Sequence, residues 1–207
     1  MKVTIFYVGS SLLGPLRQAE RDINARFGLG LAIACHNCTL PLDDAAWTRA
    51  GRDLAAADIV FVIHITDNEN AARIAAALDR HRPRHHAVIV INCLRELMLR
   101  TRLGKLELFS FFDAARPAEG EDLAMRFLRK VGSWMGNPSK TGSRSKGGGP
   151  KRPERYLKLL RQAPAILRFV PSKGTLGGIK HYLTLFCYFL QPTPANILSM
   201  VLYARQP

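Results

Sequence analysis

The chain has few cysteines: Cys35, Cys38, Cys93 and Cys187 are the four in its 207 residues. Their number and their apolar surroundings exclude a disulfide framework of the kind that holds small secreted domains together. The N-terminal residues 1–8 are typical of a strand and lack the layout of a signal peptide. Together these features predict a protein of a reducing, cytoplasmic compartment.

Long apolar runs are also missing. The most apolar late stretch, residues 182–190, is closed by Gln191 and Pro192. A membrane-spanning helix needs about 20 apolar residues. We therefore expect a packed helix here and no membrane span.

Acidic residues are scarce relative to basic ones, with 16 Asp and Glu against 30 Lys and Arg, which gives a formal net charge of +14. Such an excess favours anionic partners. The basic residues form no single stripe, however, and those of residues 136–152 lack the interleaved aromatic side chains that stack on bases. Nucleic-acid binding is therefore not expected, and much of the charge is interpreted as solvated linker and helix ends.

A self-sufficient catalytic motif is absent as well, so no catalytic residue is assigned. Residues 9–14 match neither a Walker loop nor a complete Gly-x-Gly-x-x-Gly motif, and a plain turn is the preferred interpretation. Cys35 and Cys38 have Cys-x-x-Cys spacing without a second pair, which makes them weak metal candidates. Cys93 and His64 end other strands and could converge with them, but half-buried loop cysteines remain the simpler interpretation.

Strand and helix patterns alternate four times in the first half of the chain. The predicted strands are residues 2–9, 29–35, 58–65 and 87–91, and the predicted helices follow at 14–27, from Asp43 or Asp44 through 54, and at 67–82. The strands are nearly continuous apolar runs, as expected when helices cover both faces of a parallel sheet. The sequence predicts an α/β fold with a flavodoxin-like parallel sheet.

Composition divides the chain into three parts: an α/β domain over residues 1–135 that ends in a helix at 120–134, a flexible basic linker over 136–152, and an all-α segment over 153–207. Helices are predicted at residues 154–169, 175–190 and 194–204. The helical segment is too apolar to stay exposed. We expect it to pack back on the α/β domain or to self-associate.

The candidate site lies after the strands. Glu69 and Glu96 follow two predicted strands at the edge where such sheets bind ligands. A short basic helix is expected to begin near Glu96, to carry Arg100 and Arg102, and to stop at Gly104. These four charged residues are the candidate ligand or partner contacts. The acids, with Asp67, also suit the first turns of helices, and residues 80–86 form a basic cluster at a helix end that could bind an anion.

Residues 92–105 resemble a segment of the porphyrin-binding H subunit of magnesium chelatase, a family related to the large subunit of cobalt chelatase. In that family a strand is followed by a small-residue turn, Glu, two apolar residues, a basic residue and Thr-Arg-Leu-Gly-Lys, a pattern matched here from Glu96 to Lys105. Further similar segments follow in the family's order at residues 57–70, 77–82, 159–171, 182–190 and 195–201. The family's Glu-Asp-His after the third strand is replaced by Asp67-Asn-Glu-Asn70.

The resemblance implies that this chain corresponds to the N-terminal module of an H-type chain and to the start of the helical neck region that follows it. The chain would then be a fragment, a split gene product or a relic of a longer H-type chain. In the family the larger body binds protoporphyrin IX and receives magnesium, and separate subunits use ATP. We therefore expect a positioning or interaction role in chlorophyll or bacteriochlorophyll synthesis, with no cofactor held by this chain and no chelation on its own. The alternative is a stand-alone flavodoxin-like module that binds an anion or a protein.

Overall fold

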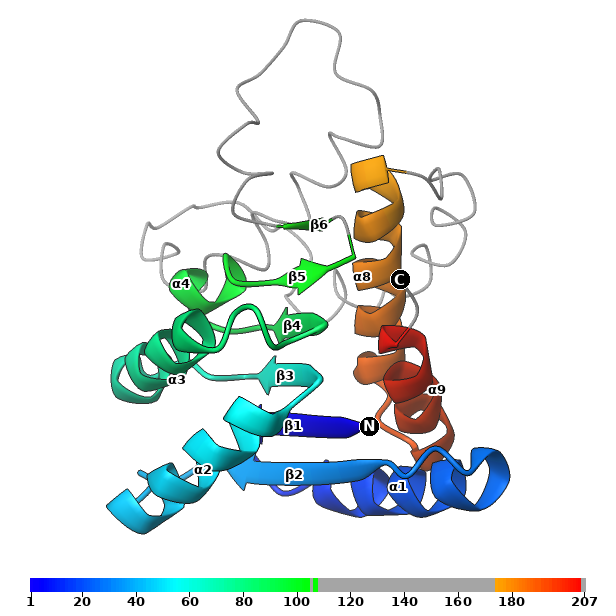
Figure 1. Cartoon of the computed structure of the whole chain (residues 1–207), viewed down its shortest axis with the longest axis horizontal. Helices are drawn as coiled ribbons and strands as arrows, with labels where there is room; N and C mark the ends of the chain where they lie inside the picture. Colours follow the sequence, from blue (N-terminus) through cyan, green and yellow to red (C-terminus); the bar gives the residue numbers. More distant parts are fainter. Residues whose placement is uncertain (105, 108–173, 206–207) are drawn as a thin grey trace, which may run out of the picture.

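The computed structural model describes residues 1–104, 106–107 and 174–205 (Figure 1). Its elements in chain order are β1 (Lys2–Tyr7), α1 (Leu13–Phe27), β2 (Ala32–Asn37), α2 (Asp44–Ala56), β3 (Ile59–Ile63), α3 (Asn68–Arg80), β4 (Ala87–Ile91), α4 (Arg95–Met98), β5 (Arg102–Leu103), β6 (Leu106–Glu107), α8 (Gly174–Leu190) and α9 (Pro194–Ala204).

The strands form one sheet in the order β2-β1-β3-β4-β5-β6. The first four strands are parallel, so the predicted flavodoxin-like order is confirmed for them. β3 and β4 are buried along their whole length, which explains their unbroken apolar sequences. Two short antiparallel strands, β5 and β6, extend the sheet beyond β4.

Helices cover both faces of the sheet (Figure 1). The chain runs from β1 outward to β2, then returns across β1 to β3 and continues to β4. Connections between parallel strands are right-handed, so this change of direction places α1 on one face of the sheet and α2 and α3 on the other. α9 packs on α1 and on α8. The described part of the tail therefore packs back on the α/β domain, as expected.

α8 is joined to the sheet across a long separation in sequence. The Tyr182 side chain is 2% exposed, and its hydroxyl donates a hydrogen bond of 2.6 Å to the Val90 carbonyl in β4. Gly178 lies so close to β6 that a Cβ added to it would be 2.5 Å from the Cβ of Leu106. Only a residue without a side chain allows this close approach.

The other edge of the sheet is closed by side chains of α1. Asn24 accepts a 2.6 Å hydrogen bond from the Leu31 amide and donates one of 2.8 Å to the Leu31 carbonyl. Glu20 accepts from the Ile33 amide, and Arg17 donates to the Ile33 carbonyl, both at 2.8 Å. Edge strands expose backbone groups that invite another strand. These three polar residues occupy the place that a neighbouring strand would take.

The basic helix after β4 is shorter than predicted. α4 ends at Met98, and the chain turns into β5 and β6, so the prediction of a helix continuing to Gly104 is wrong. Gly104 does adopt a left-handed conformation, with φ of 57°, but it lies between β5 and β6 and ends no helix. Leu103 and Leu106, which flank this turn, are both buried in the core. Burial of these two side chains favours the hairpin over a longer exposed helix.

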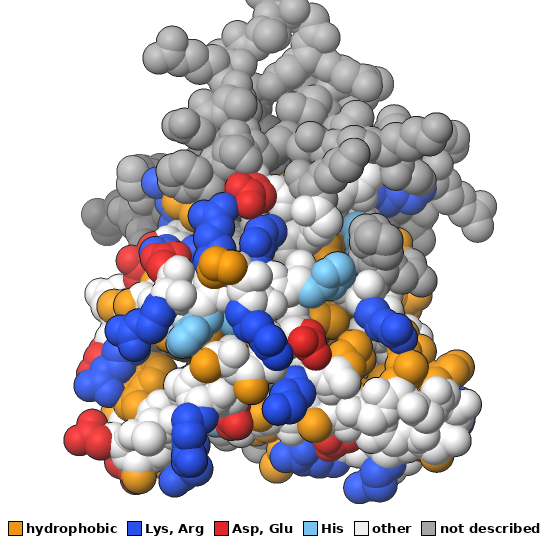
Figure 2. All heavy atoms as spheres, in the orientation of Figure 1, with side chains coloured by type: hydrophobic (Ala, Val, Ile, Leu, Met, Phe, Trp, Pro, Cys, Tyr) orange, Lys and Arg blue, Asp and Glu red, His pale blue; other side chains and the backbone are white. Residues whose placement is uncertain are grey.

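Several predicted features lie outside the described residues: the helix at 120–134, the linker at 136–152, the helix at 154–169 and the domain boundaries. Within the described residues, no helix is both long and apolar enough to cross a membrane. Figure 2 shows Lys and Arg side chains scattered among acidic and apolar ones on the face in view, without a single basic stripe.

Candidate functional site

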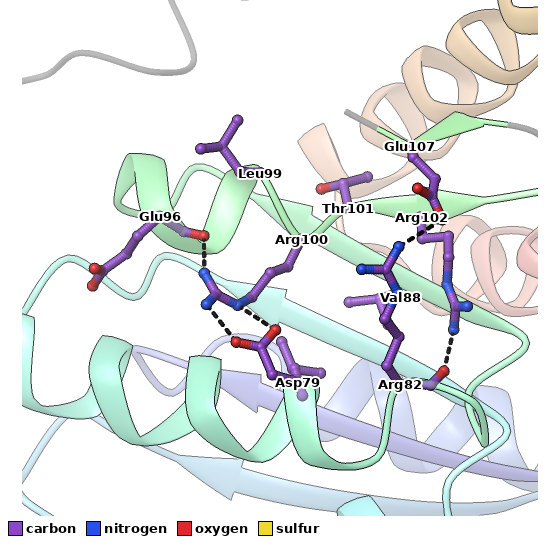
Figure 3. Close-up of a pocket in the computed structure, with 10 residues that line it drawn as sticks. Asp79, Arg82, Val88, Glu96, Leu99, Arg100, Thr101, Arg102 and Glu107 are labelled. Atoms are coloured by element: carbon purple, nitrogen blue, oxygen red, sulfur yellow. Dashed lines mark hydrogen bonds and ion pairs between the residues drawn. The ribbon is translucent and has the colours of Figure 1, made fainter. Parts of the chain in front are cut away.

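A pocket of about 330 Å³ opens beside the C-terminal half of α3, α4 and β5 (Figure 3). Its wall includes three aliphatic side chains, those of Leu78, Val88 and Leu99. Charged side chains dominate the remainder, and six of them line it: Asp79, Arg82, Glu96, Arg100, Arg102 and Glu107. The segment that carries the family resemblance therefore forms one side of this pocket.

Arg100 connects α4 to α3. Its Nε and Nη2 atoms donate to the two carboxylate oxygens of Asp79 at 2.9 and 2.6 Å, and its Nη1 atom donates to the Glu96 carbonyl at 2.6 Å. Such a two-pronged guanidinium–carboxylate pair is stronger and more directional than a single contact. Arg100 thus fixes the short helix α4 against α3.

Arg102 holds the loop between α3 and β4. Its Nη2 atom donates to the carbonyls of Arg82 and His85, at 2.6 and 2.5 Å. His85 is buried, and its Nε2 atom lies 2.9 Å from the Leu54 carbonyl of α2. Burial lowers the pKa of His85, and the nearby cation of Arg102 lowers it further, against the opposing effect of the hydrogen bond to Leu54. A neutral His85 therefore suits this position.

Arg82 and Glu107 form the exposed rim of the pocket. Their side chains are 61% and 41% exposed, and the Arg82 Nη2 atom lies 2.9 Å from Glu107 Oε1. An ion pair so accessible to water contributes about 0–1 kcal/mol. The pair can therefore open at low cost, unlike the contacts of Arg100 and Arg102.

Among the four predicted contact residues, the pocket brings together Glu96, Arg100 and Arg102 but not Glu69. Glu69 is 72% exposed in the first turn of α3 and lies 3.6 Å from Arg73. The side chain of Glu96 is exposed, and its carboxylate points away from the arginines in Figure 3. The two acids expected to share the strand edge thus occupy separate surfaces.

Burial favours the protonated thiol at three of the cysteines. Burial raises the pKa of Cys35, and it raises the pKa of Cys38 and of Cys93 to about 12. Cys93 Sγ accepts from the Ile65 amide at 3.3 Å, between the ends of β3 and β4. Metal binding and redox exchange require thiolates. No group of three or more His, Cys, Asp or Glu residues within the described ranges could hold a metal ion.

Residues at the ends of β3 and β4 adopt left-handed backbone conformations. His64 has φ of 61° and Asn92 has φ of 56°, and both residue types tolerate this region better than most. The His64 amide donates to the Ile91 carbonyl at 3.0 Å, and the Leu94 amide donates to the Ile65 carbonyl at 3.0 Å. These contacts, with the thiol of Cys93, join the two strand ends and direct the chain from β4 toward α4.

Sequence reasoning missed Asp79, Arg82 and Glu107 as pocket residues. Arg82 belongs both to the basic cluster at residues 80–86 and to the family-like segment at residues 77–82, but neither pattern assigns it to a contact site. Asp79 lies in the same family-like segment without a role attached to it, and Glu107 lies in no segment that the sequence singles out. The basic cluster and the segment at residues 77–82 are therefore the two signals that the sequence offers for this side of the pocket.

The fold and the pocket define a flavodoxin-like α/β module with an ion-paired pocket beside its antiparallel edge. The chain belongs to the family described as "Domain of unknown function (DUF3479)", which matches residues 2–183. This domain is found in cobalt- and magnesium-chelatase-type proteins. A comparison with curated proteins gave no match.

Proposed function

We propose that this chain is the N-terminal module of a magnesium-chelatase H-type protein and acts in (bacterio)chlorophyll synthesis by positioning or binding other parts of the enzyme. The main support is the family match over residues 2–183, since that domain is found in chelatase-type proteins. The segment most similar to the H subunit lines the pocket, which adds support. In this proposal the partners are the rest of a large chelatase subunit and its ATPase subunits, in the cytoplasm.

Metal insertion into protoporphyrin IX is assigned to the larger body. It requires a concave apolar cavity for the macrocycle and groups that accept the pyrrole protons. Among the described residues, the pocket has three aliphatic side chains, and two of its arginines, Arg82 and Arg100, are already paired with Glu107 and Asp79. Protoporphyrin IX and magnesium are therefore substrates handled elsewhere, and ATP is used by the partner subunits.

Complementation in trans tests this role. An H-type subunit that lacks the corresponding N-terminal region is assayed with its ATPase subunits, ATP, magnesium and protoporphyrin IX, with and without this chain. We expect the added chain to restore magnesium insertion while remaining inactive without the larger body. Physical association is measured in parallel by sedimentation of the same mixtures.

The alternative is a stand-alone anion- or protein-binding module. It predicts neither restored insertion nor association with the larger body. A chain that fails in both measurements would contradict the chelatase assignment. A chain that inserts magnesium alone would contradict the division of labour between this module and the larger body.

A further inference from the structure

We propose that the pocket between α3, α4 and β5 binds a carboxylate group, with Arg102 as its main anchor and Arg82 as a second arginine released from Glu107. The biological partner that carries this carboxylate rests on the proposed function. The carboxylate binding itself can be measured on this chain alone.

Arg102 has hydrogen-bonding capacity that the described residues do not use. A guanidinium has five N–H donors. Two of them, both on Nη2, donate to the Arg82 and His85 carbonyls, while none of the described residues accepts a hydrogen bond from Nε or Nη1. The side chain is half-buried, and within the described residues no carboxylate lies within ion-pair distance of it. A partly desolvated cation of this kind favours an anionic partner.

The charged side chains inside the pocket do not balance among the described residues. Arg82, Arg100 and Arg102 contribute three positive charges to the pocket, whereas Asp79 and Glu107 contribute two negative ones. Glu96 adds little to the interior because its carboxylate points away from the arginines (Figure 3). Among the described residues, the interior of the pocket therefore has one positive charge in excess, and a carboxylate carries the single negative charge that balances it. A phosphate group carries about −1.5 to −2 at pH 7 and would add repulsion from Glu107.

Arg82 can change partners. Its ion pair with Glu107 is exposed to water and therefore weak, so an incoming carboxylate can replace Glu107. Arg100 is different, because its paired hydrogen bonds to Asp79 also fix α4. Leu78, Val88 and Leu99 offer aliphatic contacts to the carbon chain that carries the carboxylate.

The test is a titration of the full chain with N-acetyl-glutamate amide, followed by NMR of the arginine Nε–H groups. The matched neutral probe is N-acetyl-glutamine amide, and inorganic phosphate is the competing anion. We expect saturable shifts with the glutamate probe and none with the glutamine probe. Equal shifts with both probes, or tighter binding of phosphate, would overturn the proposal.

Four variants locate the site. Glu107→Gln removes the competing carboxylate and is expected to tighten binding by up to about fivefold, the equivalent of about 1 kcal/mol. Arg82→Gln and Arg102→Lys should weaken it severalfold, since lysine keeps the charge but lacks the planar fork. Arg73→Gln, in α3 but outside the pocket, should leave the affinity unchanged. If Arg102→Lys destabilises the fold, an unchanged affinity in Glu107→Gln would still refute the proposal.

A second arm distinguishes the source of the carboxylate. An acidic hexapeptide and its glutamine counterpart are titrated in the same way. Tighter binding of the acidic peptide than of the single amino acid supports an acidic segment of a partner protein. Equal binding of the two supports a free small carboxylate, and binding of neither overturns the proposal whatever the complementation assay shows.

Discussion

At the β2 edge of the sheet, side chains of α1 bind the outward backbone groups of the strand that follows this helix directly in sequence. At the opposite edge, the sheet is extended by β5 and β6 and contacted by α8, which comes about 70 residues later in the chain. The first edge is closed by local contacts and is fully hydrogen-bonded at Leu31 and Ile33. The second edge is contacted by the remote helix α8, while the pocket beside it is lined by residues between 78 and 107. The pocket therefore lies beside the edge that local side chains do not close.

The contact between α8 and β6 gives the largest expected effect. Gly178→Ala places a Cβ 2.5 Å from that of Leu106. The control is Gly51→Ala in α2, where a Cβ meets no atom within 4 Å. Both changes replace glycine by alanine inside a helix, so both gain the same helix propensity. The difference between the two variants in the free energy of unfolding therefore measures the clash with Leu106. Overpacking of this kind costs about 1–3 kcal/mol.

Urea denaturation of the two variants measures that difference. We expect Gly51→Ala to stabilise the chain. The free energy of unfolding of Gly178→Ala should be lower than that of Gly51→Ala by about 1–3 kcal/mol. Equal midpoints for the two variants would show that α8 does not pack closely on β6.

The β2 edge is tested by Asn24→Ala. This change removes both hydrogen bonds to Leu31 and leaves its amide and carbonyl unpaired, at a cost of about 1–3 kcal/mol. Alanine has a higher helix propensity than asparagine and regains about 0.5 kcal/mol, so we expect the free energy of unfolding to fall by about 1–2 kcal/mol in total. Thermal unfolding measures it, and sedimentation shows whether the uncovered edge also causes self-association.

Gln18→Ala is the matched control for that experiment. Gln18 lies in the same helix, and its amide donates to Asp22 within α1 instead of to the strand. We expect less than about 0.5 kcal/mol of change. A similar loss in both variants would mean that the α1 side chains contribute only to their own helix.

The attachment of α8 to β4 gives a smaller effect. Tyr182→Phe removes the hydroxyl that donates to the Val90 carbonyl and should cost about 1 kcal/mol. Tyr188→Phe is the control, because the described residues provide no hydrogen bond to the Tyr188 hydroxyl. Equal unfolding midpoints for the two variants would argue against a stabilising hydrogen bond between α8 and the sheet.

The pH dependence of stability is the smallest expected effect. Burial lowers the pKa of His85 below its ordinary value of 6.5, so the folded chain binds fewer protons than the unfolded one. Stability is therefore retained above about pH 6.5 and decreases as the pH falls through and below that value. Burial lowers the pKa of His36 and His181 in the same direction, so they add to the slope.

His85→Asn should reduce this slope between pH 7 and pH 5 without removing it. The free energy of unfolding, measured by urea denaturation at several pH values, gives the slope for each form. A slope unchanged by the substitution would mean that His85 is not held neutral by the fold.

Much of the fold was predictable because the signals are local. The apolar runs of β3 and β4 are visible in the sequence, as is an aspartate cap of α2 at Asp43 or Asp44, and the structure has both strands and places the cap at Asp43. The error at α4 has a local cause too, since residues 99–104 are compatible with a helix ending at glycine. An alternation was present, however: Thr101 and Leu103 are buried and Arg102 between them is half-buried, which is the period of a strand.

The pocket was only partly predictable. Glu96, Arg100 and Arg102 come from one continuous segment, and the resemblance drew attention to it. Asp79 and Glu107 join them through tertiary packing of α3 and β6, which periodicity does not reveal. The ion pairs that decide which arginines are free for a ligand follow from that packing alone.

The central claim is that this module contributes contacts to a chelatase and has no porphyrin site of its own. Fluorescence titration of the full chain with protoporphyrin IX, beside the Glu96→Ala variant, tests it most directly. The account predicts weak, non-saturable binding that is the same for both proteins. Tight, saturable binding that is lost on Glu96→Ala would contradict it and would place a porphyrin site at the pocket.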